Sequence, residues 1–185
     1  RRRLAEKTLD ESQQRYRALI EFSPVGIAVQ RGDRFVYANP AVVTMLGAAS
    51  ADPVLQTPVL ELVHVDSRPA MALRAQKREL MPPATEPRIE ARLLRFDGAV
   101  IDVEIEGSAI VYGGSQATQI SIVDITERHR AAREIEQLAF YDPLTGLPNR
   151  RLLMDRLRRA VVSSGRHECR GSVLFLDLDH FKDLN

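Results

Sequence analysis

Alternating apolar and polar positions predict five β-strands in the first part of the chain. In a strand that buries one face, every second side chain points to the core, and glycine-containing turns join antiparallel neighbours. The later strands alternate most clearly, as in the segment where Ile101, Val103 and Ile105 are in phase. The expected strands are residues 25–30, 34–38, 88–95, 100–111 and 117–125, with turns at 31–33, 97–98 and 113–114.

Helical patterns lie between the second and third of these strands. Asn39 is a favoured N-cap residue, Pro40 fits the first helical position, and Gly47 supplies a stop. Prolines divide residues 48–65 into short helical turns, and a longer helix is expected over residues 69–80. Two strands, several short helices and three strands predict an α+β fold, with an antiparallel sheet that carries its helices on one face.

Two further helical patterns flank this region. Residues 4–21 and the stretch after Asp124 repeat apolar positions at steps of four and three, which makes a narrow seam along each helix. Asp124 and Glu127 have the spacing of a capping box, and Asp142-Pro143 ends the second helix. Such a seam has two interpretations. It is either a short parallel contact between two chains or one face of an ordinary surface helix. The seam positions are Ala5, Leu9, Ser12, Tyr16 and Leu19 in the first helix, and Ala131, Ile135 and Leu138 in the second.

The end of the chain has a different pattern. Pro148 starts a helix that carries Leu152, Leu153, Leu157 and Val161, and an apolar strand is expected at Val173–Leu176. Asp177 and Asp179 follow that strand. Carboxylates at the C-terminal end of a strand lie where α/β sheets bind ligands, and they suit Mg²⁺. Helix caps or surface acids are the structural alternative.

Composition excludes several classes of function. A formal net charge of +1 over 185 residues gives no reason to expect a nucleic-acid partner or an acidic membrane surface. Cys169 is the sole cysteine, which excludes an internal disulfide and a CxxC metal or haem site. No apolar run approaches a membrane span of roughly 18 residues, and no signal peptide is present. We therefore expect a cytoplasmic fragment, whose parent protein can still be anchored upstream, since the sequence lacks an initiator Met and stops just after a strand.

Residues 15–126 resemble a PAS sensor domain. The resemblance implies a five-stranded antiparallel sheet with short helices on one face, flanked by signalling helices. It also implies that Asp124 and Thr126, from the family's DIT motif, couple the last strand to the following helix. The segments that carry the resemblance are SPVGIAV at 23–29, FVYANPAVVTMLG at 35–47, ELVHVDSR at 61–68, the DG hairpin at 97–98 and DIT at 124–126.

Residues 142–150, DPLTGLPNR, and residues 175–185, FLDLDHFKDLN, resemble the opening of the GGDEF domain of diguanylate cyclases. This would be the first helix and strand of an α/β nucleotidyl-cyclase-like domain, which uses GTP and Mg²⁺. We expect the DPLTGLPNR turn to be a structural hinge that positions the domain. The GG(D/E)EF loop is absent from the sequence, so the fragment is not expected to catalyse a reaction. The resemblance assigns metal binding to Asp177 and the Leu178 carbonyl, phosphate binding to the backbone near His180 and Phe181, and guanine binding to Asn185.

The PAS region offers few cofactor ligands. The helix after His64 contains no histidine for haem, and no cysteine precedes Cys169, so a covalent flavin adduct is excluded. His64 itself suits a capping or surface role. The expected interior either holds a small apolar ligand or is a packed core. Its candidate pocket residues are Ile27, Val29, Tyr37, Val42, Met45, Leu62, Leu93 and Ile122.

These features predict a sensor-transducer fragment of a bacterial cyclic di-GMP signalling protein, in which the PAS domain regulates a diguanylate cyclase as part of a homodimer. One alternative is a degenerate, GTP-binding GGDEF domain that regulates a phosphodiesterase. Another is a PAS domain that only dimerises. The expected organisation is an N-terminal helix at 1–21, a PAS domain at 22–126, a linker helix at 127–141 and the start of a GGDEF domain at 142–185.

Overall fold

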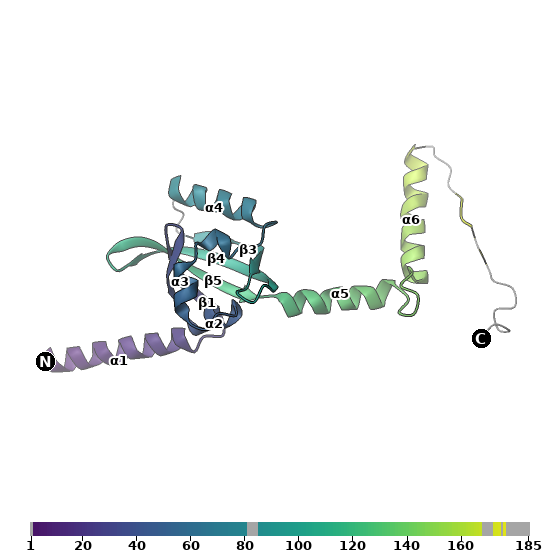
Figure 1. Cartoon of the computed structure of the whole chain (residues 1–185). Coiled ribbons are helices and arrows are strands. Elements are labelled where there is room, and N and C mark those ends of the chain that lie inside the picture. The colour runs from purple at the N-terminus through teal and green to yellow at the C-terminus, as the bar shows by residue number, and fades with distance from the viewer. Residues whose placement is uncertain (1, 81–84, 168–171, 175, 177–185) are drawn as a thin grey trace. The chain divides into compact units, whose positions relative to one another are not determined.

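The computed structural model describes residues 2–80, 85–167, 172–174 and 176 (Figure 1). The chain divides into two compact units, Arg1–His129 and Arg130–Asn185. Each unit is described by itself below.

The first unit is built on one five-stranded antiparallel sheet with the strand order β2-β1-β5-β4-β3 (Figure 1). Strand β5, the last in sequence, therefore lies in the middle, and β2 and β3 form the edges. This confirms the expected α+β sheet. The strands are β1 (Gly26–Arg31), β2 (Arg34–Ala38), β3 (Thr85–Leu94), β4 (Val100–Tyr112) and β5 (Ser115–Asp124).

Short helices supply the second layer, which covers one face of the sheet. Asn39 caps α2 as expected, because its side-chain oxygen accepts a hydrogen bond from the Val42 N–H. Two longer helices, α1 and α5, flank the sheet in sequence. The helices of this unit are α1 (Arg2–Glu21), α2 (Pro40–Met45), α3 (Ala51–Gln56), the 3₁₀ helix η1 (Val59–Glu61), α4 (Arg68–Leu80) and the start of α5 (Thr126–Phe140).

The hydrophobic core lies between the helices and the sheet. The predicted alternation is confirmed, since Ala91 and Leu93 in β3 and Ile101, Val103 and Ile105 in β4 are all buried. Their neighbours in sequence face the opposite side of the sheet. The core cluster contains Ala28, Phe35, Val42, Leu46, Val54, Val59, Leu62, Val63, Met71, Ala91, Leu93, Ile101, Val103, Ile105, Ile120 and Ile122.

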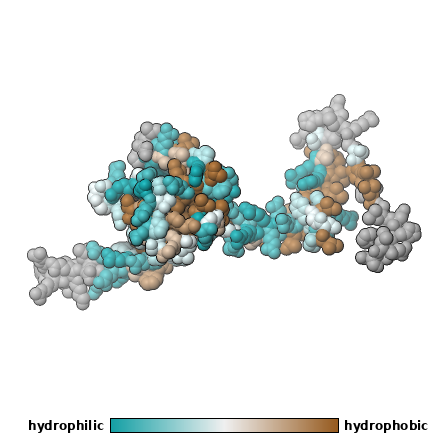
Figure 2. Space-filling view, viewed as in Figure 1, coloured by the Kyte–Doolittle hydropathy of each residue, from teal (hydrophilic) through white to brown (hydrophobic). Residues whose placement is uncertain are grey.

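The second unit contains most of α5, the turn that follows it, and α6 (Arg150–His167). Large hydrophobic side chains stay exposed here, including Leu144 in the turn and Leu153 and Val161 on α6. Figure 2 shows hydrophobic residues on the surface of α6. Within the described ranges, no helix is both long enough and apolar enough to cross a membrane.

The largest difference between an expected strand and the structure lies at the start of β3. Strand β3 begins at Thr85, three residues before the predicted start, with a register shift between Glu86 and Ile89. Of the strand expected at Val173–Leu176, the structure describes Val173, Leu174 and Leu176, which are exposed and carry no regular secondary structure, while Phe175 lies outside the described residues.

Candidate functional site

A small apolar void lies in the middle of the core. Its volume is about 20 Å³, which is room for about one water molecule. Its lining comes from four strands, the end of α2, η1, the two residues after η1, and α4. A change in any of these elements therefore reaches the same space. The lining residues are Phe35, Leu46, Val59, Leu62, Val63, Met71, Leu93, Ile105, Ile120 and Ile122.

The eight residues expected to line a pocket do not all surround this void. Leu62, Leu93 and Ile122 line it, and Val42 and Met45 lie elsewhere in the same core. Val29 and Tyr37 pair across β1 and β2 outside the core cluster, and Ile27 is likewise outside it. A ligand bound in the PAS core therefore stays a prediction.

A charged layer adjoins the apolar core beneath the C-terminal half of α4. The Glu86 carboxylate, in a side chain that is 5% exposed, accepts hydrogen bonds from Arg74 and Arg78, and Arg78 also donates to Gln30. Burial raises the pKa of Glu86, but the hydrogen bonds and charges of the two arginines outweigh burial and leave that pKa below its ordinary value. Gly107 leaves the space for Glu86, since a Cβ there would lie 3.0 Å from the carboxylate oxygen. Sequence analysis did not identify this cluster.

At the joint between the sheet and α5, hydrogen bonds from Ile125 and Thr126 to Asp102 continue the β4–β5 ladder. Val103 pairs with Asp124, the last residue of β5. Beyond that pair, the Ile125 N–H donates to the Asp102 carbonyl at 2.9 Å, and the Thr126 hydroxyl oxygen accepts from the Asp102 N–H at 3.0 Å. Ile125 itself is buried. The first residues of α5 are thus attached to β4 as a strand would be.

Asp124 lies directly before this joint. Its carboxylate oxygen accepts a hydrogen bond from the Thr126 N–H at 2.8 Å, which satisfies a free donor at the start of α5. A negative charge at this end also complements the helix dipole. Asp124 and Thr126, both predicted coupling residues, therefore lie together at the joint. Their role in coupling remains a prediction.

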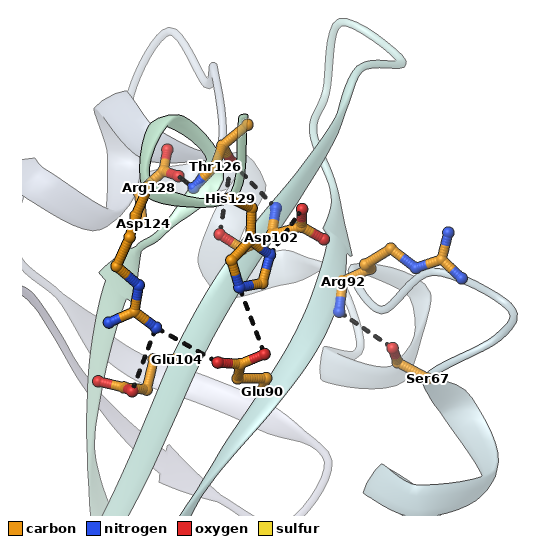
Figure 3. A network of polar contacts seen from close by, with 9 residues as sticks. All are labelled: Ser67, Glu90, Arg92, Asp102, Glu104, Asp124, Thr126, Arg128 and His129. Atoms are coloured by element: carbon orange, nitrogen blue, oxygen red, sulfur yellow. Dashed lines mark hydrogen bonds and ion pairs between the residues drawn. The ribbon is translucent and has the colours of Figure 1, made fainter. Parts of the chain in front are cut away.

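Two consecutive side chains of α5 bind the outer face of the sheet (Figure 3). Arg128 Nη2 lies 3.3 Å from Glu90 Oε1 and 3.8 Å from Glu104 Oε2. The His129 ring lies between two carboxylates, with Nδ1 3.2 Å from Asp102 and Nε2 3.4 Å from Glu90. Glu90 is the acceptor shared by both side chains. We refer to Glu90, Glu104, Arg128 and His129 as the outer clamp.

The carboxylates beside His129 do not form a metal site. They lie at different ring nitrogens, so they do not converge on one point, and no group of three such ligands suits a metal anywhere in the described ranges. A hollow of about 170 Å³ lies beside His129, lined by Ser67, Ala91 and Arg92 together with Glu90, Asp102 and His129. Ser67 Oγ in the hollow accepts a hydrogen bond from the Arg92 N–H (Figure 3). The hollow is thus bordered by the residue before α4, by β3 and β4, and by the start of α5.

The turn after α5 is closed by hydrogen bonds. Asn149 accepts from the N–H groups of Arg151 and Leu152 and donates to the Ala139 carbonyl, so one side chain holds the end of α5 and the start of α6. Asp142 accepts from both the hydroxyl and the N–H of Thr145, and these bonds lower the pKa of Asp142. The DPLTGLPNR segment is therefore a fixed turn within the second unit.

The predicted metal and nucleotide residues lie outside the described part of the structure. This holds for Asp177, Leu178, His180, Phe181 and Asn185. Their roles stay predictions. In contrast, Glu90, Asp102, Arg128 and His129 were missed because the pattern marks them only as exposed polar positions.

Two family models match the chain. The model described as "PAS fold" matches residues 14–123, and the model described as "Diguanylate cyclase, GGDEF domain" matches residues 139–185. A PAS domain of an HTR-like protein from Haloarcula marismortui has 26% sequence identity and a TM-score of 0.55. The superposition covers 68% of this chain and 100% of that one.

Curated relatives agree with these matches. The bifunctional diguanylate cyclase/cyclic di-GMP phosphodiesterase MucR of Pseudomonas aeruginosa is 53% identical over 60 residues, which are 32% of this chain and 9% of that protein. An uncharacterized signaling protein of Caulobacter vibrioides is 32% identical over 182 residues, which are 93% of this chain and 20% of that protein. The chain thus spans a minor part of each relative. The five-stranded sheet, the matched residues and these likenesses show that the chain belongs to the PAS family, and that its PAS domain is followed by the start of a GGDEF domain.

Proposed function

We propose that this chain is the sensor-transducer segment of a cyclic di-GMP signalling protein. In this proposal the PAS core holds the sensory state, and α5 passes that state to a GGDEF domain that converts two GTP into cyclic di-GMP. The homologous cyclic di-GMP signalling proteins and the two consecutive domains support this general role.

The observation that carries the proposal is the attachment of α5 to Asp102. Thr126 accepts the Asp102 N–H, and Ile125 donates to the Asp102 carbonyl, so α5 starts as an extension of the sheet. At its other end, Asn149 holds the last turn of α5 to α6, which lies within the GGDEF match. A displacement of β4 or β5 therefore acts directly on the helix that enters the GGDEF domain.

The proposed nucleotide chemistry rests on the family resemblance. Asp177 and the Leu178 carbonyl would bind Mg²⁺, the backbone near His180 and Phe181 would bind phosphate, and Asn185 would bind guanine. Mg²⁺ would supply charge stabilisation during phosphoryl transfer. These residues supply only part of a site. The 185 residues alone are accordingly proposed to be inactive, because the sequence lacks the GG(D/E)EF loop.

The proposed domain division keeps α1 and α5 as signalling helices around the PAS domain. Ile135 and Leu138 on α5 are 68% and 65% exposed, as a seam for a second chain requires. Tyr16 and Leu19 on α1 are exposed as well. Seams this short need help from other contacts, so we propose a homodimer in which both helices and the PAS surface take part.

The test uses the full-length parent protein with Thr126→Val. Valine keeps the shape of threonine but removes the hydroxyl, which accepts from the Asp102 N–H and donates weakly to the Asp102 carbonyl at 3.4 Å, at a cost of about 1–2 kcal/mol. We expect the PAS fold to survive while cyclic di-GMP synthesis no longer follows the treatment that alters the wild type. Thr57→Val, at the end of α3, is the matched control. Regulation that is unchanged in Thr126→Val would contradict the proposal.

A second candidate function follows from the relatives. MucR is named as both a cyclase and a phosphodiesterase, so the GGDEF domain can instead bind GTP and regulate a phosphodiesterase domain. The two functions differ in the reaction measured. If the parent protein hydrolyses cyclic di-GMP, responds to GTP and makes no product from GTP alone, the second function is correct.

A further inference from the structure

We propose that docking of α5 and closure of strand β3 against β4 are one coupled event, and that the Glu90–Glu104 pair provides the coupling. This inference rests on the proposed function of α5 as the output helix and specifies how the sheet regulates it. It concerns the outer clamp on the sheet, beyond the Asp124 and Thr126 joint.

The coupling starts from an unfavourable strand pair. Glu90 in β3 and Glu104 in β4 are direct partners in the antiparallel register, so their side chains leave the same face beside each other. Like charges at such a pair weaken strand pairing. Arg88 reaches Glu104, at 3.1 Å from Oε1, but the contacts of Glu90 come from α5.

Arg128 relieves this repulsion when α5 is docked. Its Nη2 lies between the two carboxylates, 3.3 Å from Glu90 and 3.8 Å from Glu104 (Figure 3). His129 adds a second contact to Glu90 and one to Asp102 in β4. If α5 leaves the sheet, Glu90 and Glu104 face each other without Arg128. Undocking therefore weakens the pairing of β3, and separation of β3 removes Glu90 from the α5 side chains.

Strand β3 can carry a change from the core to this pair. It is an edge strand, so its opening breaks one ladder only. Its inward residue Leu93 lines the apolar void, while Glu90 lies on the outer face of the same strand. The hydrogen bond from the Arg92 N–H to Ser67 also ties β3 to the start of α4. A shift of β3 caused at the void thus changes the outer clamp.

Amide exchange in the 1–185 chain tests the coupling. Arg92 and Leu94 donate their N–H groups away from β4, to Ser67 and Leu62, so Ala91 and Leu93 donate toward β4 and report its pairing. We expect Arg128→Gln to lower the protection of Ala91 and Leu93 about two- to fivefold. Glu90→Gln should remove this effect, so that adding Arg128→Gln in that background changes the two amides little.

The same samples separate coupling from a purely structural role. Glu90→Gln should lower the protection of the first turns of α5 while the thermal midpoint of the PAS domain stays constant, because Glu90 and its partner Arg128 are exposed. Glu106→Gln is the matched control, since Glu106 pairs with Arg88 in the neighbouring position, and its effect should add to that of Arg128→Gln. High salt should shrink the Arg128→Gln effect.

Two results would overturn the inference. One is an Arg128→Gln variant with unchanged protection at Ala91 and Leu93. The other is an equal Arg128→Gln effect in wild-type and Glu90→Gln backgrounds. Neither measurement needs cyclase activity. The proposed function can therefore fail in the parent protein while this coupling holds, and the coupling can fail while the proposed function holds.

Discussion

The side-chain amide of Asn39 donates a hydrogen bond to the backbone carbonyl of Ile20, 2.9 Å away, in the last turn of α1. The same amide donates to the Val25 carbonyl, and its oxygen accepts from the N–H groups of Ile27 and Val42. Asn39 is fully buried and makes all four bonds. One side chain therefore joins the end of α1, the start of β1 and the N-terminus of α2.

Asn39→Asp should destabilise the PAS domain. The carboxylate keeps the two acceptor bonds but loses both donors, so the Ile20 and Val25 carbonyls face a negative charge. We expect a loss of about 3 kcal/mol in the free energy of unfolding, measured in urea. Gln56→Glu makes the same amide-to-acid change at an exposed position of α3. Equal stability of the two variants would contradict the assigned role of Asn39.

The Glu86 cluster predicts a loss of stability in acid. Because the arginines hold the pKa of Glu86 below 4.5, the folded state favours the ionised carboxylate more than the unfolded chain does. This stabilisation is complete above the ordinary pKa and is lost as the pH falls through the lowered folded value. Glu86→Gln should flatten the decline below about pH 4.5. It should also cost about 3 kcal/mol at neutral pH, because two arginines with side chains only 10% and 17% exposed lose their partner.

The pH dependence of unfolding measures both effects in one titration. Glu136→Gln, at an exposed position of α5, is the control and should keep the wild-type profile. A Glu86→Gln variant that loses stability in acid as steeply as the wild type would show that other carboxylates dominate.

Asn149 should have two separable roles. Asn149→Asp keeps the cap of α6 but loses the donor to Ala139, whereas Asn149→Ala loses both. We expect Asn149→Ala to cost about 1 kcal/mol of α6 stability. Amide exchange at Arg151 and Leu152 should rise in the alanine variant only. Similar exchange in both variants would argue against the cap.

The two α5 seam residues predict a weaker dimer when they are charged. Ile135→Lys combined with Leu138→Lys should shift the 1–185 chain toward monomer in sedimentation, because lysines would replace the apolar contact between helices. Glu136→Lys combined with Gln137→Lys adds two lysines to α5 away from the seam. A wild-type chain that is monomeric at high micromolar concentration would rule out the proposed homodimer.

The sequence predicted the core better than the surface. Alternation identified the inward residues of β4 and β5, because burial of one face requires it. The register in which neighbouring strands pair was harder to predict from the sequence. The pattern located the turn at Asp97-Gly98, but it did not give the partners on either side, which the structure sets by the bond from the Arg95 N–H to the Ala99 carbonyl. A change of one residue in a loop reassigns every cross-strand neighbour.

Only part of the candidate site could be predicted, because the rest depends on which strands and helices lie side by side. Asp124 and Thr126 follow from a local motif, and both lie at the joint. The Glu90–Glu104 pair depends on the register, and the burial of Glu86 depends on arginines from α4, which alternation within one strand does not reveal. Long-range partners decide these positions, and a single sequence does not contain their contacts.

The small size of the core void sets a limit on any sensed molecule. A space of about 20 Å³ admits a water molecule, so a larger ligand binds only to a core that has opened. Its apparent affinity then falls by the fraction of molecules that are open: with about one molecule in a hundred open, binding is about a hundredfold weaker than the intrinsic contact. Substitutions that loosen the core should therefore strengthen the apparent binding of the ligand and shift the output of the ligand-free protein toward its ligand-bound level.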